Sequence, residues 1–205
     1  MTNSIDKLSP RKQQALQTRK KLLEAGKEAF LENGFQKATI SQIIKKANTG
    51  YGTAYVYFKN KDDLFMILME DLMNQFYEIA EIPFKPQSKD EAFDLIQKQV
   101  RLFLSLAVKE KNMMIIVKEA IGISPEIDQA WYKIRERFID RISIDIKYAQ
   151  ENSLARANLD PSLVARGWFY SNEMFMWELV QNEGSFSMDE IIHNLVSIYA
   201  NGLYE

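Results

Sequence analysis

The sequence predicts an all-α protein of about nine helices, and three observations support this fold class. Apolar residues recur at the three- and four-residue spacing of helices along most of the chain. The eight glycines and five prolines fall mainly at the ends of these periodic segments. No hairpin turn separates two alternating runs. The length of 205 residues is enough for one or two domains with a sizeable core.

Local start signals place most of the expected helices. Capping boxes begin at Thr39, Ser88 and Ser187, each with a Gln or Glu three residues later. Ser124-Pro125 and Asp160-Pro161 each put an N-cap residue before a proline at the first helical position. The expected helices, in chain order, are 11–33, 39–47, 51–58, 61–81, 88–109, 112–122, 125–152, 160–182 and 187–203.

The second and third expected helices are short, and the helix-breaking segment Asn48-Thr49-Gly50 separates them. Two such helices joined by a tight turn form a helix-turn-helix, whose second helix enters the major groove of DNA. Ala54 and Phe58 share one face of that helix and are expected to pack inward. Tyr51 and Tyr55 are then left outside, where they suit a contact surface better than a solvated one.

The charge of the chain is divided between its two parts. Residues 1–65 carry twelve Lys and Arg against six Asp and Glu, whereas the other 140 residues carry 14 against 22. The net charge of −2 therefore conceals a basic head and an acidic body. This asymmetry indicates a polyanionic partner for the head alone, although chance clustering explains the charges equally well.

The composition excludes several kinds of site. With no cysteine and a single histidine, His193, the chain cannot form a disulfide framework, a thiolate zinc site or a cysteine nucleophile. No apolar run approaches the ~20 residues of a membrane span, and the N-terminus lacks the apolar core of a secretory signal. We therefore expect a cytoplasmic protein without cofactor, bound metal or membrane contact.

The residues from Thr39 to Leu64 resemble the DNA-binding signature of the tetracycline-repressor (TetR) family. The stretch GTAYVYFKNKDDL, residues 52–64, follows the family pattern G-T-x-Y-x-Y-F-x-N-K-x-x-L. The likeness extends from Leu22 to Leu68. The resemblance implies a DNA-binding regulator without enzymatic activity.

The resemblance also implies a domain organisation. Residues 1–60, ordered from about residue 11, would form the helix-turn-helix domain. A connecting helix would span 61–81, and an effector-binding and dimerisation domain would span 82–205.

Four positions depart from the family pattern. Asn48 replaces the usual turn glycine, which is tolerable because Asn accepts a left-handed backbone. Gly50 stands where Ser or Thr is usual, and Tyr51 where Lys or Arg is frequent, so a hydroxyl and a charge are missing from the expected DNA surface. Ala54 is smaller than the usual Leu or Ile.

The family pattern assigns DNA contacts to matching residues of this chain. Tyr51, Gly52 and Thr53 should approach bases, with Gly50 and Gly52 allowing close approach of the backbone. The phosphate contacts are expected from the residues Thr39, Tyr55, Tyr57 and Lys61. Arg19, with Lys20, should lie near the flanking backbone. For Lys45 and Lys46, a solvated helix face fits as well as a DNA contact.

Aromatic and methionine residues are concentrated in the body of the chain, and the run 174–177 is apolar on every side. Such a helix must be buried all round, against a cavity, a second subunit or plain core. The expected pocket residues are Met113, Val117, Glu119, Trp131, Trp168, Tyr170, Asn172 and Phe175. Glu119, Tyr170 and Asn172, together with Arg135 and Glu173, could orient a ligand, although surface salt bridges are the simpler expectation for them.

The resemblance implies that the last two helices pair with those of a second copy in a four-helix bundle. The candidates for this dimer face are Phe175, Leu179, Ile191, Leu195, Ile198 and Tyr199.

The sequence therefore favours a homodimeric transcriptional repressor that a hydrophobic or amphipathic small molecule releases from a palindromic DNA operator. The segment 119–126 has a faint likeness to fatty-acid-responsive members of the family, which makes a fatty acyl compound one candidate effector. An all-α enzyme is the first alternative, but a single histidine cannot supply the paired Glu-x-x-His motifs of a helical metal site. A second alternative is an adaptor that keeps the helix-turn-helix without binding DNA.

Overall fold

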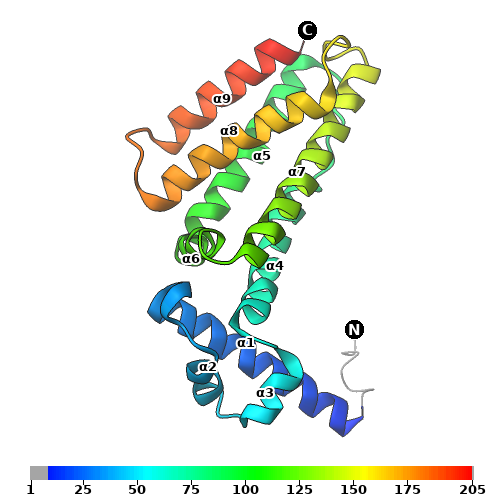
Figure 1. The fold of residues 1–205 in the computed structure, drawn as a ribbon. Coiled ribbons are helices and arrows are strands. Elements are labelled where there is room, and N and C mark those ends of the chain that lie inside the picture. The colour runs from blue at the N-terminus through cyan, green and yellow to red at the C-terminus, as the bar shows by residue number, and fades with distance from the viewer. Residues whose placement is uncertain (1–8, 205) are drawn as a thin grey trace. The chain divides into compact units, whose positions relative to one another are not determined.

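The computed structural model describes residues 9–204. These residues form nine α-helices and no β-strand, apart from an isolated bridge between Ala155 and Tyr204. The helices are α1 (Pro10–Lys37), α2 (Ile40–Lys46), α3 (Tyr51–Tyr57), α4 (Lys61–Ala80), α5 (Lys89–Lys109), α6 (Lys111–Ile121), α7 (Pro125–Glu151), α8 (Pro161–Gln181) and α9 (Met188–Leu203) (Figure 1). The all-α prediction is confirmed, and the expected ranges agree with these bounds to within a few residues.

Local hydrogen bonds explain why the predicted helix ends are correct. Thr39 and Ser187 form complete capping boxes at the starts of α2 and α9. Ser88 and Asp160 each accept the backbone N–H of the residue three positions later. Asn48, between α2 and α3, has a φ of 51° and lies in the left-handed region, as expected for a residue replacing glycine.

Contacts divide the chain into two compact units, which we describe separately. The N-terminal unit contains the residues up to Asp71 together with Ile116–Asp128, and the C-terminal unit contains Leu72–Ile115 and the chain from Gln129 onward. The division falls inside α4, α6 and α7. Residues 116–128, which the resemblance placed in the C-terminal domain, belong to the N-terminal unit, where Glu119 binds the backbone at the C-terminal end of α1.

The core of the N-terminal unit is built around three phenylalanines. The ring of Phe65 makes edge contacts with Phe30 and Phe35, at centroid distances of 4.9 and 5.1 Å. Ile43 of α2 and Ala54 of α3 are also fully buried. The short helices α2 and α3 are thus held by side chains on their inner faces alone.

In the C-terminal unit, α5, α8 and α9 pack against one another (Figure 1). Ring contacts join Phe76 to Phe103, Phe103 to Phe138, and Phe138 to Phe169. This series of aromatic side chains passes through the interior of the unit. Within residues 9–204, no helix is both long and apolar enough to cross a membrane.

Candidate functional site

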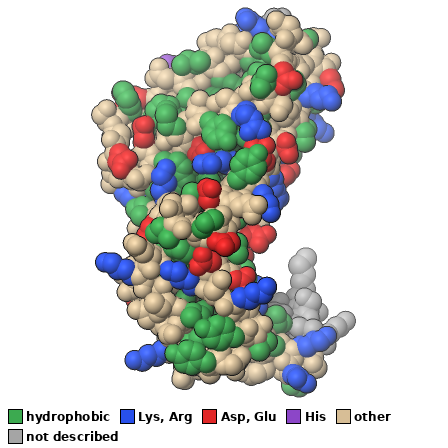
Figure 2. All heavy atoms as spheres, viewed as in Figure 1, with side chains coloured by type: hydrophobic (Ala, Val, Ile, Leu, Met, Phe, Trp, Pro, Cys, Tyr) green, Lys and Arg blue, Asp and Glu red, His purple; other side chains and the backbone are tan. Residues whose placement is uncertain are grey.

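The outer face of α3 carries the largest exposed apolar side chains of the helix-turn-helix. Tyr51, Tyr55 and Val56 are 57%, 49% and 78% exposed, whereas Ala54 on the opposite face is buried. Figure 2 shows hydrophobic side chains gathered over α2 and α3. Monomeric proteins rarely leave such side chains together in water, so this face is suited to binding a partner.

The sequence YGTAYVY of α3 contains no charged or carboxamide side chain. It therefore offers hydroxyl groups, methyl groups and rings to a partner. Gly52 and Thr53 are exposed on the same helix. Val56 was not among the predicted DNA residues, although its place two residues after the buried Ala54 would have put it on the outer face.

The start of α2 is fixed by a reciprocal cap. The Thr39 hydroxyl accepts the N–H of Gln42 at 3.3 Å, and the Gln42 amide oxygen accepts the backbone N–H of Thr39 at 2.8 Å. Thr39 also donates its hydroxyl hydrogen to the Gln42 side chain. Its side chain therefore orders the helix end that the sequence analysis assigned to a phosphate.

Residues 34–38, from the kink at Gly34 near the end of α1 to the C-cap Ala38, are called here the α1–α2 corner. Gly34 has φ 73° and ψ 173°, a conformation that is essentially restricted to glycine. The Glu119 carboxylate accepts the backbone N–H groups of Phe35 at 2.9 Å and Gln36 at 3.0 Å. A Cβ at Gly34 would lie 2.8 Å from the same carboxylate. The prediction that Glu119 lines a ligand pocket is wrong, because the carboxylate satisfies backbone donors of the N-terminal unit.

Lys61 binds the same corner from its carbonyl side. Its ammonium donates to the carbonyl oxygens of Phe35 at 2.7 Å, Gln36 at 3.1 Å and Ala38 at 3.2 Å. It also lies 4.5 Å from the centre of the Phe35 ring. All three N–H donors are therefore directed at the protein, which favours a positioning role over the predicted phosphate contact.

The other residues predicted to contact phosphates, and the neighbouring basic residues, differ in exposure and in the side chains that they contact. Tyr55 is exposed, and Tyr57 is partly buried with its ring 6.4 Å from that of Phe58. The Arg19 guanidinium lies 5.9 Å from the Phe58 ring, near the end of α3. Lys46 forms ion pairs with Glu28 and Glu32 of α1, at 3.0 and 2.7 Å.

The C-terminal unit contains a partly open cavity of about 100 Å³ between the end of α4 and the helices α5, α7, α8 and α9. Its lining is mainly aromatic and aliphatic and contains Ile79, Ala80, Phe84, Ile96, Gln99, Val100, Phe103, Phe138, Arg141, Ile142, Asp145, Trp168, Phe169, Asn172, Tyr199 and Tyr204. A second cavity of about 10 Å³ shares Phe103, Phe138 and Phe169 with it. These three rings therefore form a common wall between the two spaces.

Three of the eight predicted pocket residues line these cavities. Trp168 and Asn172 line the larger one, and Trp131 lines the smaller one. The other five are not part of either lining. Met113 and Val117 are buried elsewhere in the core, Glu119 binds the α1–α2 corner, Tyr170 is 38% exposed, and Phe175 is partly exposed. Tyr199, predicted for the dimer face, instead stacks on Trp168 at 4.0 Å in the larger cavity.

An ion pair lies in the lining of the larger cavity. Arg141 donates to Asp145 at 2.5 Å and lies 3.4 Å from the carboxylate of Glu81. Burial raises the pKa of Asp145 to about 6, and the hydrogen bond from Arg141 opposes only part of that effect. Burial, together with the charge of Asp145, raises the pKa of both Tyr199 and Tyr204, so both phenols stay protonated at neutral pH.

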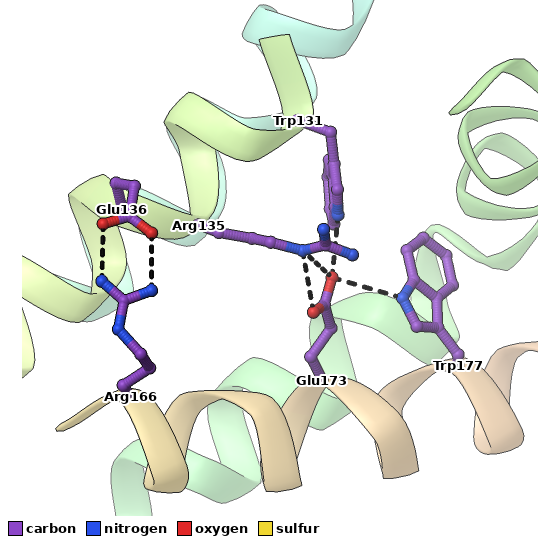
Figure 3. Close-up of polar contacts among 6 residues, drawn as sticks. All are labelled: Trp131, Arg135, Glu136, Arg166, Glu173 and Trp177. Atoms are coloured by element: carbon purple, nitrogen blue, oxygen red, sulfur yellow. Dashed lines mark hydrogen bonds and ion pairs between the residues drawn. The ribbon is translucent and has the colours of Figure 1, made fainter. Parts of the chain in front are cut away.

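A buried carboxylate joins α7 to α8 beside the smaller cavity (Figure 3). Glu173 is 4% exposed and accepts hydrogen bonds from Arg135 at 2.9 Å and from the indoles of Trp131 at 2.8 Å and Trp177 at 3.4 Å. Its oxygens are thereby satisfied by three donors. Glu173 and Arg135 thus form an ion pair, as one of the two expected roles required, but the pair is largely buried and not at the surface.

The exposed side chains of α8 and α9 only partly match the predicted dimer face. Ile198 is 74% exposed, and Phe175, Leu179 and Leu195 are partly exposed. Ile191 is 5% exposed within its own chain, so it offers little surface to a partner. Further exposed apolar side chains of this region, not predicted, are Leu163, Tyr170 and Met174 on α8.

Two family models match separate parts of the chain. Residues 22–66 match the family model of bacterial regulatory proteins of the tetR family. Residues 96–205, more than half of the chain, match the model for the C-terminal domain of the transcriptional regulator EthR.

Individual relatives resemble the chain over nearly its whole length. It is 24% identical over 186 residues to the fatty acid metabolism regulator protein of Bacillus subtilis strain 168, covering 89% of this chain and 94% of that protein. A solved structure assigned to TetR-family regulators of Syntrophomonas wolfei is similar with a TM-score of 0.72 and 24% identity, covering 89% and 93% of the two chains. Another, assigned as a fatty acid metabolism regulator of Clostridium perfringens, has a TM-score of 0.63 and 21% identity, covering 89% and 97%.

Proposed function

Since the chain belongs to the TetR family of bacterial transcriptional regulators, we propose that it is a ligand-responsive repressor of transcription. The observation that carries the proposal is the exposed face of α3, where Tyr51, Tyr55 and Val56 stand outside a helix-turn-helix that is otherwise packed inward. The same chain contains an aromatic cavity in its other unit. A DNA-reading surface and a ligand site are the two parts that such a repressor needs.

In this proposal α3 enters the major groove. Tyr51, Gly52, Thr53 and Val56 face the bases, and the methyl groups of Val56 can contact thymine methyls. The Tyr55 and Tyr57 hydroxyls bind phosphates, as does the N-terminus of α2, whose free N–H groups favour an anion. Arg19 contacts the flanking backbone. Lys61 and Glu119 act as positioning residues, because they fix the α1–α2 corner and hence α2.

We further propose that two copies associate through α8 and α9. Ile198, Leu163, Tyr170 and Met174 are exposed apolar side chains on these helices, and their burial in a dimer would remove them from water. A two-fold dimer presents two copies of α3 to two half-sites of a palindromic operator. Replacing Ile198 by Glu should shift the protein from dimer to monomer in analytical ultracentrifugation, whereas Glu at the exposed Ile144 of α7 serves as the matched control.

The effector acts in this scheme by shifting populations. A ligand that prefers one arrangement of the dimer favours the state in which the two recognition helices no longer match successive major grooves. The helices α4 and α6 each contribute residues to both units, so they are candidate routes for this coupling. The relative from Bacillus subtilis is named for fatty acid metabolism, and an acyl compound is therefore one candidate effector.

The test of the repressor proposal is binding to the DNA beside its own gene. Fluorescence anisotropy at moderate salt should show binding to that DNA at least about a thousandfold tighter than to random DNA, as specific regulators typically do. Protection of a palindromic site in a footprint should accompany it. Equal affinity for the two DNAs would refute the proposal and favour an adaptor role.

A further inference from the structure

The larger cavity of the C-terminal unit combines aromatic walls with a small number of polar groups. Phe103, Phe138 and Phe169 contribute ring faces or edges, and Trp168 stacks on Tyr199 with an interplanar angle of 20°. Such walls take the apolar body of a ligand and also attract a cation placed over a ring face. The polar groups of the lining then decide which polar group the ligand can carry.

The one basic group of the cavity lining is already paired with carboxylates. Arg141 is that basic side chain, and its guanidinium contacts Asp145 of the lining at 2.5 Å and, outside the lining, the exposed carboxylate of Glu81 at 3.4 Å. A ligand carboxylate would therefore have to compete with two carboxylates for one guanidinium. A ligand cation would instead lie beside the carboxylate of Asp145, which attracts it.

Asn172 adds a neutral acceptor that has no partner. It is 7% exposed, and its amide nitrogen donates to the backbone carbonyl of Trp168 at 2.8 Å. Its Oδ1 is buried in the cavity lining and accepts no hydrogen bond. Leaving a buried acceptor unpaired is unfavourable, and a ligand that donates a hydrogen bond would remove that penalty.

We propose that the cavity selects an apolar molecule with a hydrogen-bond-donating ammonium group and discriminates against a free carboxylate. The ammonium would be paired with Asp145 and Asn172, and the apolar body would lie against the aromatic rings. This proposal rests on the proposed function, because it assigns the polar group of the effector that the repressor would bind. A cavity with this preference would bind a free fatty acid more weakly than an alkylammonium of the same length.

The test compares three ligands with the same eight-carbon chain. Octylammonium, octanoate and 1-octanol are titrated into the full-length protein by isothermal calorimetry at pH 7.5. Octylammonium should bind at least tenfold more tightly than octanoate, and 1-octanol, which carries no charge, should lie between them. Octanoate binding as tightly as octylammonium, or no binding of octylammonium, would overturn the proposal.

Two variants assign the preference to named groups. Asp145→Asn keeps the size of the side chain and should abolish the preference for octylammonium over octanoate. Asn172→Leu should weaken octylammonium binding. Asp140→Asn, the same change at an exposed position of α7 outside the cavity, should leave both affinities unchanged. Should either cavity variant fail to fold, the ranking of the three ligands on the unmodified protein decides the question.

Failure of the proposed function gives a different result. If octylammonium binds with the expected preference but never changes the affinity for DNA, the proposed ammonium preference is supported and the proposed repressor mechanism is refuted. If octanoate binds better and releases DNA, the proposed repressor mechanism is supported and the proposed ammonium preference is refuted.

Discussion

The two units depart from the usual distribution of residues in opposite ways. The N-terminal unit exposes apolar side chains on α3, with Val56 78% exposed, whereas the C-terminal unit buries polar ones, with Asn172 only 7% exposed. Both arrangements cost stability in an isolated chain. This difference indicates that the N-terminal unit is suited to binding a large partner at its surface. The C-terminal unit is suited to binding a small molecule in its interior.

The largest expected effect concerns the α1–α2 corner, which holds the helix-turn-helix in place. Gly34→Ala forces a side chain into a glycine-only conformation and against the Glu119 carboxylate, so it should lower the free energy of unfolding by about 3 kcal/mol. Urea denaturation followed by circular dichroism measures the change. The control is Gly52→Ala, where no atom lies within 4 Å of the new Cβ and helix propensity should raise stability by up to about 1 kcal/mol. A Gly34→Ala protein as stable as the unmodified chain would contradict the role of the corner.

A substitution of Lys61 tests whether this residue only stabilises the α1–α2 corner or also contacts DNA. Lys61→Met keeps the aliphatic stem but removes three bonds to carbonyls, and we expect a loss of about 2 kcal/mol in unfolding free energy. The salt dependence of DNA binding should stay unchanged, because no phosphate contact is lost. A slope reduced by about one, with unchanged stability, would instead restore the phosphate contact that the sequence predicted.

In the C-terminal unit, pH should change the affinity for the octylammonium probe. The carboxyl of Asp145, with its pKa raised to about 6, is largely protonated at pH 5 and ionised at pH 7.5. The groups that face it are Arg141, Glu81, Tyr199 and Tyr204, and the raised pKa values of the two phenols keep both tyrosines protonated over this range. An alkylammonium also stays charged, as a lysine does. The affinity should therefore rise about tenfold from pH 5 to pH 7.5, a change of about 1.4 kcal/mol. Calorimetry on Asp145→Asn should give a flat profile, and a falling profile in the unmodified protein would contradict the assignment.

The smallest expected effect concerns Val56 on the exposed face of α3 and tests whether this side chain reads DNA sequence. Val56→Ser keeps α3 intact but removes methyl groups that would meet thymine, so specific DNA binding should weaken by about 1 kcal/mol. Binding to random DNA should not change, and anisotropy titrations measure both. Val108→Ser, at a 38% exposed position of α5, is the control outside the DNA surface. Equal weakening on both DNAs would show that Val56 does not read sequence.

Features that depend on neighbouring residues could be predicted from the sequence. The capping boxes at Thr39 and Ser187 and the left-handed backbone at Asn48 are set by residues a few positions away. The inward direction of Ala54 follows from helical periodicity. These features fixed the helix-turn-helix and the direction of its outer face.

Features that depend on distant residues could not be predicted in the same way. Glu119 binds backbone groups 83 and 84 residues away, and nothing in its own helix indicates that partner. Tyr199 and Ile198 are adjacent on α9, yet one lines the cavity and the other is exposed. Apolar periodicity finds the apolar residues of a helix, but it does not distinguish core, cavity and partner when several faces are apolar.

The positions of the tryptophans have a practical consequence for spectroscopy. The chain has three, Trp131, Trp168 and Trp177, and all belong to the C-terminal unit. Trp168 lines the larger cavity, and the other two lie at the Glu173 carboxylate. Tryptophan fluorescence of the unmodified protein, excited selectively over tyrosine, therefore originates in the C-terminal unit, with no background from the helix-turn-helix. Any change in that emission when DNA is added would be a direct optical record of communication between the two units.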